Sequence, residues 1–581
     1  MVITAVVAAI AATASLGLII STQRAGNKGN ATVEENRKRG PGGWSQDELA
    51  RFLPRTQPPP LAVSPRDLRG VDTGAGGAET AWNDPAPISG YTTYDSIQRG
   101  FPLQLHLRST VGALDLRIAR QGWYGGNGQL DYLSVNNVAA SAQPIPVPDT
   151  GTGLIAAAWP LTYQVLDTSS WPSGMYVVRM TRTGTTSPAY YVPFVVRDEG
   201  RASDVLMAIP LATYQAYNAW GGKSLYDYNS GNARSHKVSF DRPYDANNGL
   251  GLYYGGDYQL IRFLEREGYD VSYATSSDLE SNANLLSGHK AFVSAFHDEY
   301  WSWNMRDALE RGRDRGSGVA FLASNNIYWQ VRWESATTGV PRRVIVSYKN
   351  AQLDPVTASN PSRSTVLWRD PLVGRPENGF LGSMFDTTLG YGQAVPWVVT
   401  NASSWVYAGT GLQNGQSIAN LIGYEFDRLY ANGAAPTNVE VLTASPVVRP
   451  ELFINSVAHA TIYQAPSGAW VFNAGTNYWP MFLEGSFLSA GQPDERVRQM
   501  TRNVINRMVG SANPPPPTTP PSSVAPPTTA PVTAPSLPAV GPRPIAPAAP
   551  IAVAPPPRGV APQAPGGPPG GTGRGSASAS G

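Results

Sequence analysis

A short polar segment that follows an apolar run carries the residues best suited to chemistry in this chain. The segment AFHDEYW places His297, Asp298 and Glu299 side by side at the end of the run HKAFVSAF. Imidazoles and carboxylates can transfer protons or bind a metal ion. Because side chains alternate along an extended segment, His297 and Glu299 share one side and Asp298 faces the other. We therefore expect His297 and Glu299 to belong to a site, and we assign Asp298 no role in it.

Two further polar clusters also follow apolar runs. Tyr214, Tyr217 and Asn218 come after VLMAIP, and Asn325 comes after GVAFLAS. In a mostly parallel sheet the carboxyl ends of the strands meet at one edge, where ligands bind. We therefore expect these side chains to converge with Glu299.

The elements that must position these clusters alternate between strands and helices from residue 204 onward. The apolar runs VLMAIP, YDVSYAT, HKAFVSAF and GVAFLAS are typical of buried strands. Residues 258–268 and 304–316 have the spacing of amphipathic helices closed by glycine. This alternation predicts a doubly wound, mostly parallel sheet.

The chain before residue 200 has a different pattern. Runs such as PLQLHLRS, ALDLRIAR and MYVVRMTR alternate apolar and polar residues between turns, which predicts an antiparallel β-sandwich. The predicted fold class is thus an α/β doubly wound, mostly parallel sheet domain at residues 201–512, preceded by an antiparallel β-sandwich domain at residues 81–200.

Both ends of the chain differ in composition from this predicted folded part. Residues 1–24 begin with an apolar run that is long enough for a signal peptide or a membrane anchor. Basic residues follow this run and none precedes it, which by the positive-inside rule favours a cytoplasmic body. Residues 25–80 are predicted to be a linker and residues 513–581 a Pro-rich disordered tail. On balance we expect a secreted or cell-envelope protein, with membrane or cell-wall attachment through its termini.

Composition excludes several kinds of function. The 581 residues carry a formal net charge of +2, which gives no electrostatic sign of a nucleic-acid partner. The absence of cysteine excludes thiolate nucleophiles, iron–sulfur clusters and disulfides. Five histidines, the carboxylates and 27 tyrosines remain as metal ligands. Hard oxygen donors of this kind suit a ferric or similar ion, which could activate water.

Several longer motifs resemble the N,N-dimethylformamidase large (beta) subunit-like family. These motifs are RIARQGWYGG, WPSGMYVVRM, YYVPFVVR, TYQAYN, HDEYW, WRDP and WVFNAGTNYW, in that order between about residues 91 and 508. The resemblance implies hydrolysis of a small amide by a mononuclear ferric iron held by two tyrosines and one glutamate. The family's enzyme works in the cytoplasm with a small partner subunit. The apolar N-terminus and the Pro-rich tail here favour another location without that partner, and a homo-oligomer stays open.

The resemblance also implies which residues hold the iron. The glutamate corresponds to Glu299, and the tyrosines correspond by order and approximate spacing to Tyr217 and Tyr176. Tyr214 is an alternative for either tyrosine.

Three catalytic residues follow from the same resemblance. His297 is a candidate proton shuttle, Asn325 a hydrogen-bond donor to the substrate oxygen, and Glu425 a nearby acid or base. No residue singles out dimethylformamide as the substrate.

Each assignment has a structural alternative. Tyr176 alternates with Val178 and Met180, as a tyrosine in the core of the β-domain would. Glu425 lies close to Asp427 and could belong to a salt-bridged surface strand. A competing function is a non-catalytic cell-envelope protein that binds carbohydrate or protein through aromatic segments such as DEYWSWNM.

Overall fold

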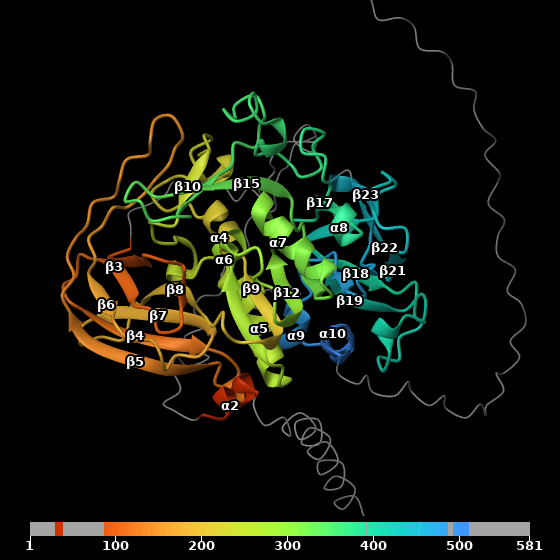
Figure 1. Ribbon diagram of the computed structural model, residues 1–581, viewed down its shortest axis with the longest axis horizontal. Coiled ribbons are helices and arrows are strands. Elements are labelled where there is room, and N and C mark those ends of the chain that lie inside the picture. Colours follow the sequence, from red (N-terminus) through yellow and green to blue (C-terminus); the bar gives the residue numbers. More distant parts are fainter. Residues whose placement is uncertain (1–29, 39–85, 391, 453, 486–491, 511–581) are drawn as a thin grey trace, which may run out of the picture. The chain divides into compact units, whose positions relative to one another are not determined.

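The computed structural model describes residues 30–38, 86–390, 392–452, 454–485 and 492–510 (Figure 1). The predictions for residues 1–24 and 513–581 fall outside the described residues. In the part that is described, no helix is long and apolar enough to cross a membrane.

Two sheets between residues 88 and 197 form the first part of the fold. The three-stranded sheet has the order β1 (Ile88–Thr92), β3 (Leu103–Ser109), β6 (Tyr163–Val165) and is antiparallel. The five-stranded sheet has the order β2 (Ser96–Gln98), β8 (Tyr190–Arg197), β7 (Gly174–Arg182), β4 (Leu114–Gln121), β5 (Gln129–Val138). Strand β2 pairs with β8 in parallel, and the other neighbours in this sheet are antiparallel.

The two sheets share one apolar core. Alternate residues of several strands enter the same buried cluster, for example Leu103, Leu105 and Leu107 of β3 and Tyr176 and Val178 of β7. This period of two is the pattern that predicted strands here.

A seven-stranded sheet forms the second part of the fold. Its order is β11 (Val271–Thr275), β9 (Ser203–Ile209), β12 (His289–His297), β14 (Gly318–Ser324), β25 (Trp470–Asn473), β24 (Thr461–Gln464), β21 (Glu440–Val441). The strands from β11 to β25 are parallel, whereas β24 and β21 each run antiparallel to their neighbour. The carboxyl ends of these five parallel strands, and that of β21, therefore lie at one edge.

Apolar side chains cover both faces of this sheet. Along β9, Val205 and Met207 enter one buried cluster, and Leu206 and Ala208 enter another. Helices α5 (Asp257–Arg266) and α10 (Glu495–Val509) add residues to the first cluster, and α6 (Ser276–Ser281) and α7 (Trp303–Asp314) add residues to the second. Burial on both faces explains why these strands are apolar throughout rather than alternating.

Helices α5 and α7 confirm the two helices predicted from spacing. Helix α7 begins at Trp303 because the Ser302 side chain accepts a hydrogen bond from the Met305 amide over 3.2 Å. The wider classification as a doubly wound domain after a β-sandwich stays a prediction, and so do the domain boundaries.

Shorter elements surround the seven-stranded sheet. A four-stranded sheet has the order β10 (Lys237–Ser239), β16 (Val344–Val346), β15 (Trp329–Glu334), β13 (Tyr300–Ser302). Three strand pairs follow later in the chain: β17 (Met384–Thr388) with β20 (Glu425–Arg428), β18 (Val395–Val398) with β19 (Ser417–Ile422), and β22 (Ser445–Arg449) with β23 (Ile454–Ala458). The remaining α-helices of the described residues are α2 (Ala31–Arg37), α4 (Leu211–Tyr217), α8 (Asn378–Leu381) and α9 (Met481–Glu484).

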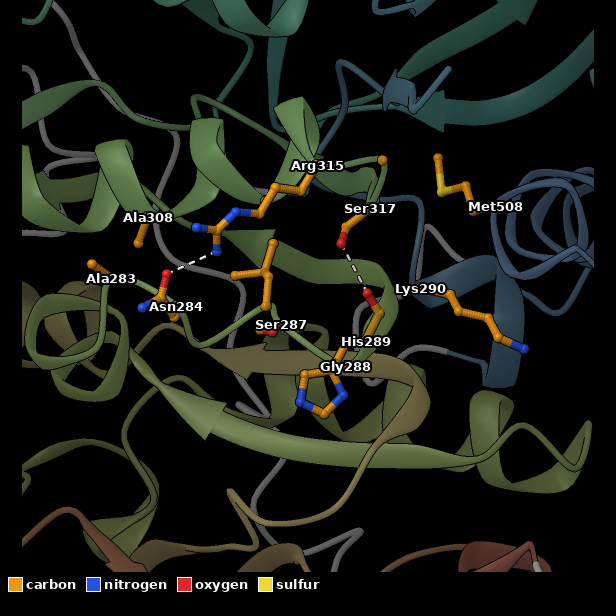
Figure 2. Close-up of a pocket in the computed structure, with 13 residues that line it drawn as sticks. Ala283, Asn284, Ser287, Gly288, His289, Lys290, Ala308, Arg315, Ser317 and Met508 are labelled. Atoms are coloured by element: carbon orange, nitrogen blue, oxygen red, sulfur yellow. Dashed lines mark hydrogen bonds between the residues drawn. The ribbon is translucent and has the colours of Figure 1, made fainter. Parts of the chain in front are cut away.

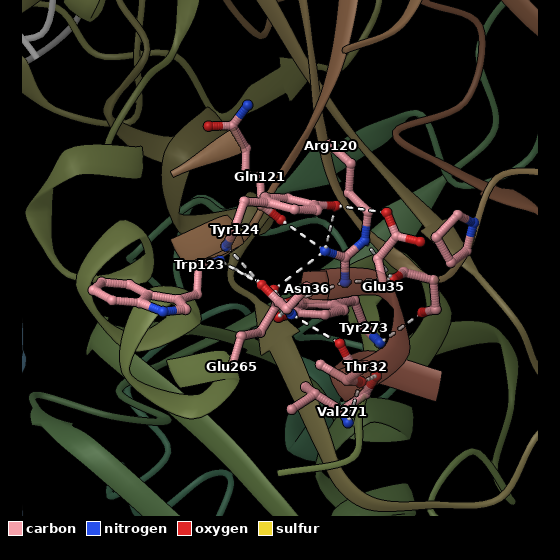
Figure 3. Close-up of polar contacts among 12 residues, drawn as sticks. Thr32, Glu35, Asn36, Arg120, Gln121, Trp123, Tyr124, Glu265, Val271 and Tyr273 are labelled. Atoms are coloured by element: carbon pink, nitrogen blue, oxygen red, sulfur yellow. Dashed lines mark hydrogen bonds and ion pairs between the residues drawn. The ribbon is translucent and has the colours of Figure 1, made fainter. Parts of the chain in front are cut away.

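Helix α2 lies within the stretch that the sequence predicts to be a linker, yet it is docked by specific contacts (Figure 3). The Asn36 side chain accepts from the amides of Trp123 and Tyr124 and donates to Glu265 over 2.9 Å. Glu265 in turn pairs with the buried Arg120 over 2.7 Å. The helix therefore completes a buried polar network between the first sheets and α5, which a Gly- and Pro-rich composition does not reveal.

Candidate functional site

The candidate site lies at the carboxyl edge of the seven-stranded sheet. Strand β12 ends at His297, β14 ends just before Asn325, and α4, which follows β9, ends at Tyr217. Phe296 and Asn325 both have left-handed backbones, with φ of 57° and 55°. Non-glycine residues in this conformation are uncommon and gather at functional sites.

Glycines make room for the turn at the end of β12. A Cβ on Gly255 or Gly256 would overlap the Phe296 side chain, so no larger residue fits at either position. These glycines, which the sequence places before α5, therefore let the end of β12 pack closely against the start of that helix.

The centre of the site is one oxygen of the buried Glu299 side chain. The Tyr217 hydroxyl donates to Glu299 Oε2 over 2.9 Å, and the Tyr226 hydroxyl donates to the same oxygen over 2.8 Å. His297 Nε2 lies 3.5 Å from this oxygen and 3.0 Å from the Tyr217 hydroxyl. Tyr300 donates to the Tyr226 hydroxyl over 2.7 Å. Two phenols and an imidazole thus converge on one carboxylate.

The electrostatics of this cluster disfavour extra negative charge. Burial, and next the charge of Glu299, raise the pKa of Tyr217 well above its usual value. Burial lowers the pKa of His297 to about 3, so the ring is neutral at neutral pH. A phenol in this setting becomes a phenolate when a cation displaces its proton.

A second carboxyl group faces the same histidine. Glu425 Oε2 lies 3.4 Å from His297 Nε2 and accepts from the side-chain amides of Asn477 over 2.9 Å and Asn325 over 3.4 Å. Burial, and next the charge of Glu299, raise the pKa of Glu425 well above its usual value. This buried position replaces the salt-bridged surface strand considered from the sequence.

Two polar atoms of the cluster are buried without a hydrogen-bond partner among the described residues. They are His297 Nδ1 and Asn325 Oδ1. Buried polar atoms are almost always bonded, so these two atoms are available to bond a ligand of the site.

A lysine adds a positive charge beside the tyrosines. Lys349 Nζ lies 3.7 Å from the ring centre of Tyr226, 4.9 Å from that of Trp329 and 5.4 Å from that of Tyr300. A cation over an aromatic face is attracted to it, and it also favours the anionic form of a phenol.

The other tyrosines considered from the sequence lie elsewhere. Tyr176 is in the core shared by the first two sheets, stacked on Trp171, and its hydroxyl donates to the Pro172 carbonyl over 2.9 Å. The Tyr214 hydroxyl donates to Asp257 over 2.6 Å. The structure therefore brings together Tyr217, Glu299, His297, Asn325 and Glu425, but neither Tyr176 nor Tyr214.

Asp298 points away from the cluster, as its alternation with His297 predicts. Its carboxylate accepts from Ser294 and from the Trp301 indole, both over 2.7 Å. It therefore anchors β12 to the strand that follows.

The sequence reasoning missed Tyr226, Asn477 and Lys349. Tyr226 lies in the irregular loop after α4, where neither periodicity nor a strand end marks it. Asn477 follows β25, and the rule used for the other strand ends could have found it there.

The donor set fits a hard cation if the phenols are included. Among the described residues, no group of three or more His, Asp or Glu side chains is placed to hold a metal ion. The phenol oxygens of Tyr217 and Tyr226 instead lie 2.9 and 2.8 Å from Glu299 Oε2, which brings three oxygen donors together. Such oxygen donors suit a ferric ion.

A separate cavity of about 450 Å³ lies at the opposite end of β12 (Figure 2). Its lining includes His289, which begins β12, together with Arg315 and Met508. Arg315 donates to Asn284 there over 2.8 Å. None of the predicted site residues lines this cavity.

Comparison with known proteins agrees with the resemblance of the motifs. Residues 115–494 match the model of the N,N-dimethylformamidase beta subunit-like family, C-terminal part. The chain therefore belongs to this family.

Two curated relatives carry the name N,N-dimethylformamidase beta subunit. The protein from Alcaligenes sp. is 25% identical over 288 residues, and that from Paracoccus aminophilus is 25% identical over 291 residues. Each match covers 44% of this chain and 36% of the relative. The chain thus matches little more than a third of these proteins.

A solved cycloisomaltooligosaccharide glucanotransferase from Paenibacillus sp. is also similar in part. It covers 43% of this chain and 56% of its own, with 10% identity and a TM-score of 0.14. A likeness this low carries no argument.

Proposed function

We propose that the protein hydrolyses the C–N bond of a small, non-peptide amide, using a mononuclear iron held by Tyr217, Tyr226 and Glu299. The observation that carries this proposal is the convergence of both phenols on one oxygen of Glu299. Tyr226 takes the place that the resemblance gave to Tyr176, because the Tyr176 hydroxyl is bonded to the backbone within the core of the first two sheets.

A ferric ion bound there would supply a Lewis acid for an amide carbonyl and for water. The remaining chemistry belongs to the side chains around it. His297, neutral and with Nδ1 unbonded, can accept a proton during attack by water. Asn325 can donate its side-chain amide hydrogen to the substrate oxygen.

Glu425 suits the second half of the reaction. An amine leaves an amide readily only if it takes up a proton. Burial and the charge of Glu299 raise the pKa of Glu425, which favours its protonated form, and Glu425 lies next to His297. We therefore propose that Glu425 and His297 pass a proton to the leaving nitrogen.

The family supports the substrate class. The relatives are named as subunits of N,N-dimethylformamidase, and on that basis we propose a small amide substrate and assembly with at least one further chain. Export to the cell envelope stays a separate proposal that rests on the apolar run at residues 1–24.

Metal analysis of the purified full chain tests the proposal. We expect about one iron per chain, a visible phenolate-to-iron absorption, and hydrolysis of simple amides such as formamides. Tyr217→Phe and Tyr226→Phe should each weaken or abolish the absorption, because each removes a ligand.

The matched controls are Tyr214→Phe and Tyr176→Phe, which remove the same atom from phenols bonded to Asp257 and Pro172. Both should keep the iron and its absorption. A wild-type protein without iron, or loss of the absorption in Tyr176→Phe but not in Tyr226→Phe, would overturn the proposed ligand set.

A further inference from the structure

Tyr217 and Tyr226 reach the same carboxylate because the chain between them closes a loop. The Leu225 amide donates to the Ala216 carbonyl over 2.9 Å, which joins the residues that directly precede the two tyrosines. The two phenol rings stack with their centres 4.3 Å apart. The geometry of the pair therefore depends on how firmly this loop is held.

One buried arginine, Arg242, holds both ends of the loop. Its Nη1 donates to the carbonyls of Lys223 over 2.7 Å and Trp220 over 3.2 Å. Its Nη2 donates to the carbonyls of Asn218 over 2.8 Å and Gln215 over 3.3 Å. Its Nε donates to the Gln215 side chain over 3.4 Å. All five N–H groups of the guanidinium are thereby used on α4 and the loop.

Asn218, the first residue after α4, makes further hydrogen bonds that hold the loop. Its Oδ1 accepts from the amides of Trp220 and Asp245, both over 3.1 Å. Its Nδ2 donates to the Pro243 carbonyl over 2.8 Å. The Arg242 side chain thus bonds to the loop, and the Asn218 side chain of the loop bonds to the segment that carries Arg242.

Arginine is suited to this position and lysine is not. The carbonyls at the end of a helix lack intrahelical partners and carry partial negative charge, so they solvate a buried cation. A planar guanidinium can reach carbonyls in several directions at once, whereas an ammonium is a single point of donation.

We propose that Arg242, supported by Asn218, is a positioning residue that holds Tyr217 and Tyr226 in place for joint binding of iron at Glu299. The role of iron in this inference rests on the proposed function. The role of Arg242 in holding the loop does not. Arg242 acts through the backbone carbonyls of the segment that carries both phenols.

The test compares Arg242→Lys with Arg343→Lys in the full chain. Arg343 is an equally buried arginine that donates to the carbonyls of Thr92 and Phe240 and pairs with Asp241, so its hydrogen bonds hold other carbonyls than those of α4 and the tyrosine loop. We expect Arg242→Lys to weaken iron binding by roughly 10- to 100-fold, the usual effect of losing an outer partner of a metal site. It should also shift the phenolate-to-iron absorption, and Arg343→Lys should leave both unchanged.

A second readout needs no metal. In the iron-free protein, hydrogen exchange of the Leu225 amide reports opening of the loop, and Arg242→Lys should accelerate it by at least about tenfold relative to Arg343→Lys. Equal exchange in the two variants would overturn the inference, whether or not the wild type binds iron. Unchanged iron affinity and absorption in folded Arg242→Lys would also overturn it.

The two measurements distinguish failure of the proposed function from failure of the inference about Arg242. A wild type without iron contradicts the proposed function, while accelerated exchange in Arg242→Lys still supports the role of Arg242 in holding the loop. If Arg242→Lys does not fold, Asn218→Ala loosens the same loop, and the same two measurements decide.

Discussion

Two buried clusters in this protein pair tyrosines with glutamates, and they differ in how their charge is balanced. In the cluster between the first sheets and α5, Glu265 meets the Arg120 guanidinium over 2.7 Å and also accepts from Tyr273 (Figure 3). In the site cluster, Glu299 meets two phenols and a neutral imidazole, and a second carboxyl group, Glu425, lies close by.

Under the proposed function, this difference separates a structural network from a metal-binding one. A buried ion pair with satisfied hydrogen bonds holds elements together. A buried carboxylate that accepts from two phenols beside a neutral imidazole can instead bind a ligand that brings positive charge. Substitutions in the two clusters should therefore damage different properties.

The largest expected effect on stability is that of Glu265→Gln. This change leaves the Arg120 guanidinium buried without its carboxylate, which costs about 3–5 kcal/mol of unfolding free energy. Urea unfolding measures it, and the iron content of the protein that remains folded should be unchanged. Glu334→Gln, on an exposed pair with Lys237, should cost below about 1 kcal/mol. Similar losses in both variants would contradict this account of the structural cluster.

Glu299→Gln should instead impair iron binding and leave the free energy of unfolding intact. Iron binding and amide hydrolysis should fall by more than about 100-fold, beyond the range seen for outer partners of a metal. The iron-free variant should be as stable as the wild type or more stable, because the Gln side chain keeps an oxygen that can accept from both phenols while a buried negative charge is removed. Paired urea unfolding and metal analysis check both statements. Destabilisation on the scale of Glu265→Gln would erase the distinction between the clusters.

The sequence predicts the site cluster around Glu299 far better than the cluster around Glu265. His297, Glu299 and Asn325 follow strands whose apolar runs are plain, so the strand-end rule placed them together. Tyr226 could not be placed this way, because a loop held by Arg242 brings it back to α4. Helix α2 was also hidden, since its contacts are made by polar side chains with partners more than 80 residues away.

A smaller effect on the structural cluster is expected from Glu35→Gln. The Glu35 carboxylate is buried in α2 and accepts from the Tyr124 hydroxyl over 2.9 Å. Losing its charge should cost roughly 1–2 kcal/mol, about the difference between charged and neutral hydrogen bonds. The exposed neighbour Glu34 provides the control, and Glu34→Gln should change stability little.

The loss in Glu35→Gln should depend on pH. Burial acts to raise the pKa of Glu35, but the Arg120 charge and hydrogen bonds outweigh it and lower the pKa. A lowered pKa gives stability that is present above the unfolded value of about 4.3 and is lost as the pH falls through the folded value. Urea unfolding of Glu35→Gln and wild type should therefore differ at pH 7, and the difference should shrink only once the pH falls below the unfolded value and through the folded one. A constant difference across this range would count against an ionised Glu35 in the network.

The smallest effect is expected for substitutions of Lys349. The two clusters differ in where their cation lies. Arg120 contacts a carboxylate directly, whereas Lys349 Nζ lies over the Tyr226 ring at 3.7 Å. Lys349→Met should weaken iron binding by about fivefold, near 1 kcal/mol, because a cation over the ring favours the phenolate. Lys349→Arg keeps the charge and should keep the affinity. A competition titration with an iron chelator measures both variants, and equal affinities for Met and Arg would mean that this cation does not act on the phenolate, leaving the iron alone to ionise Tyr226.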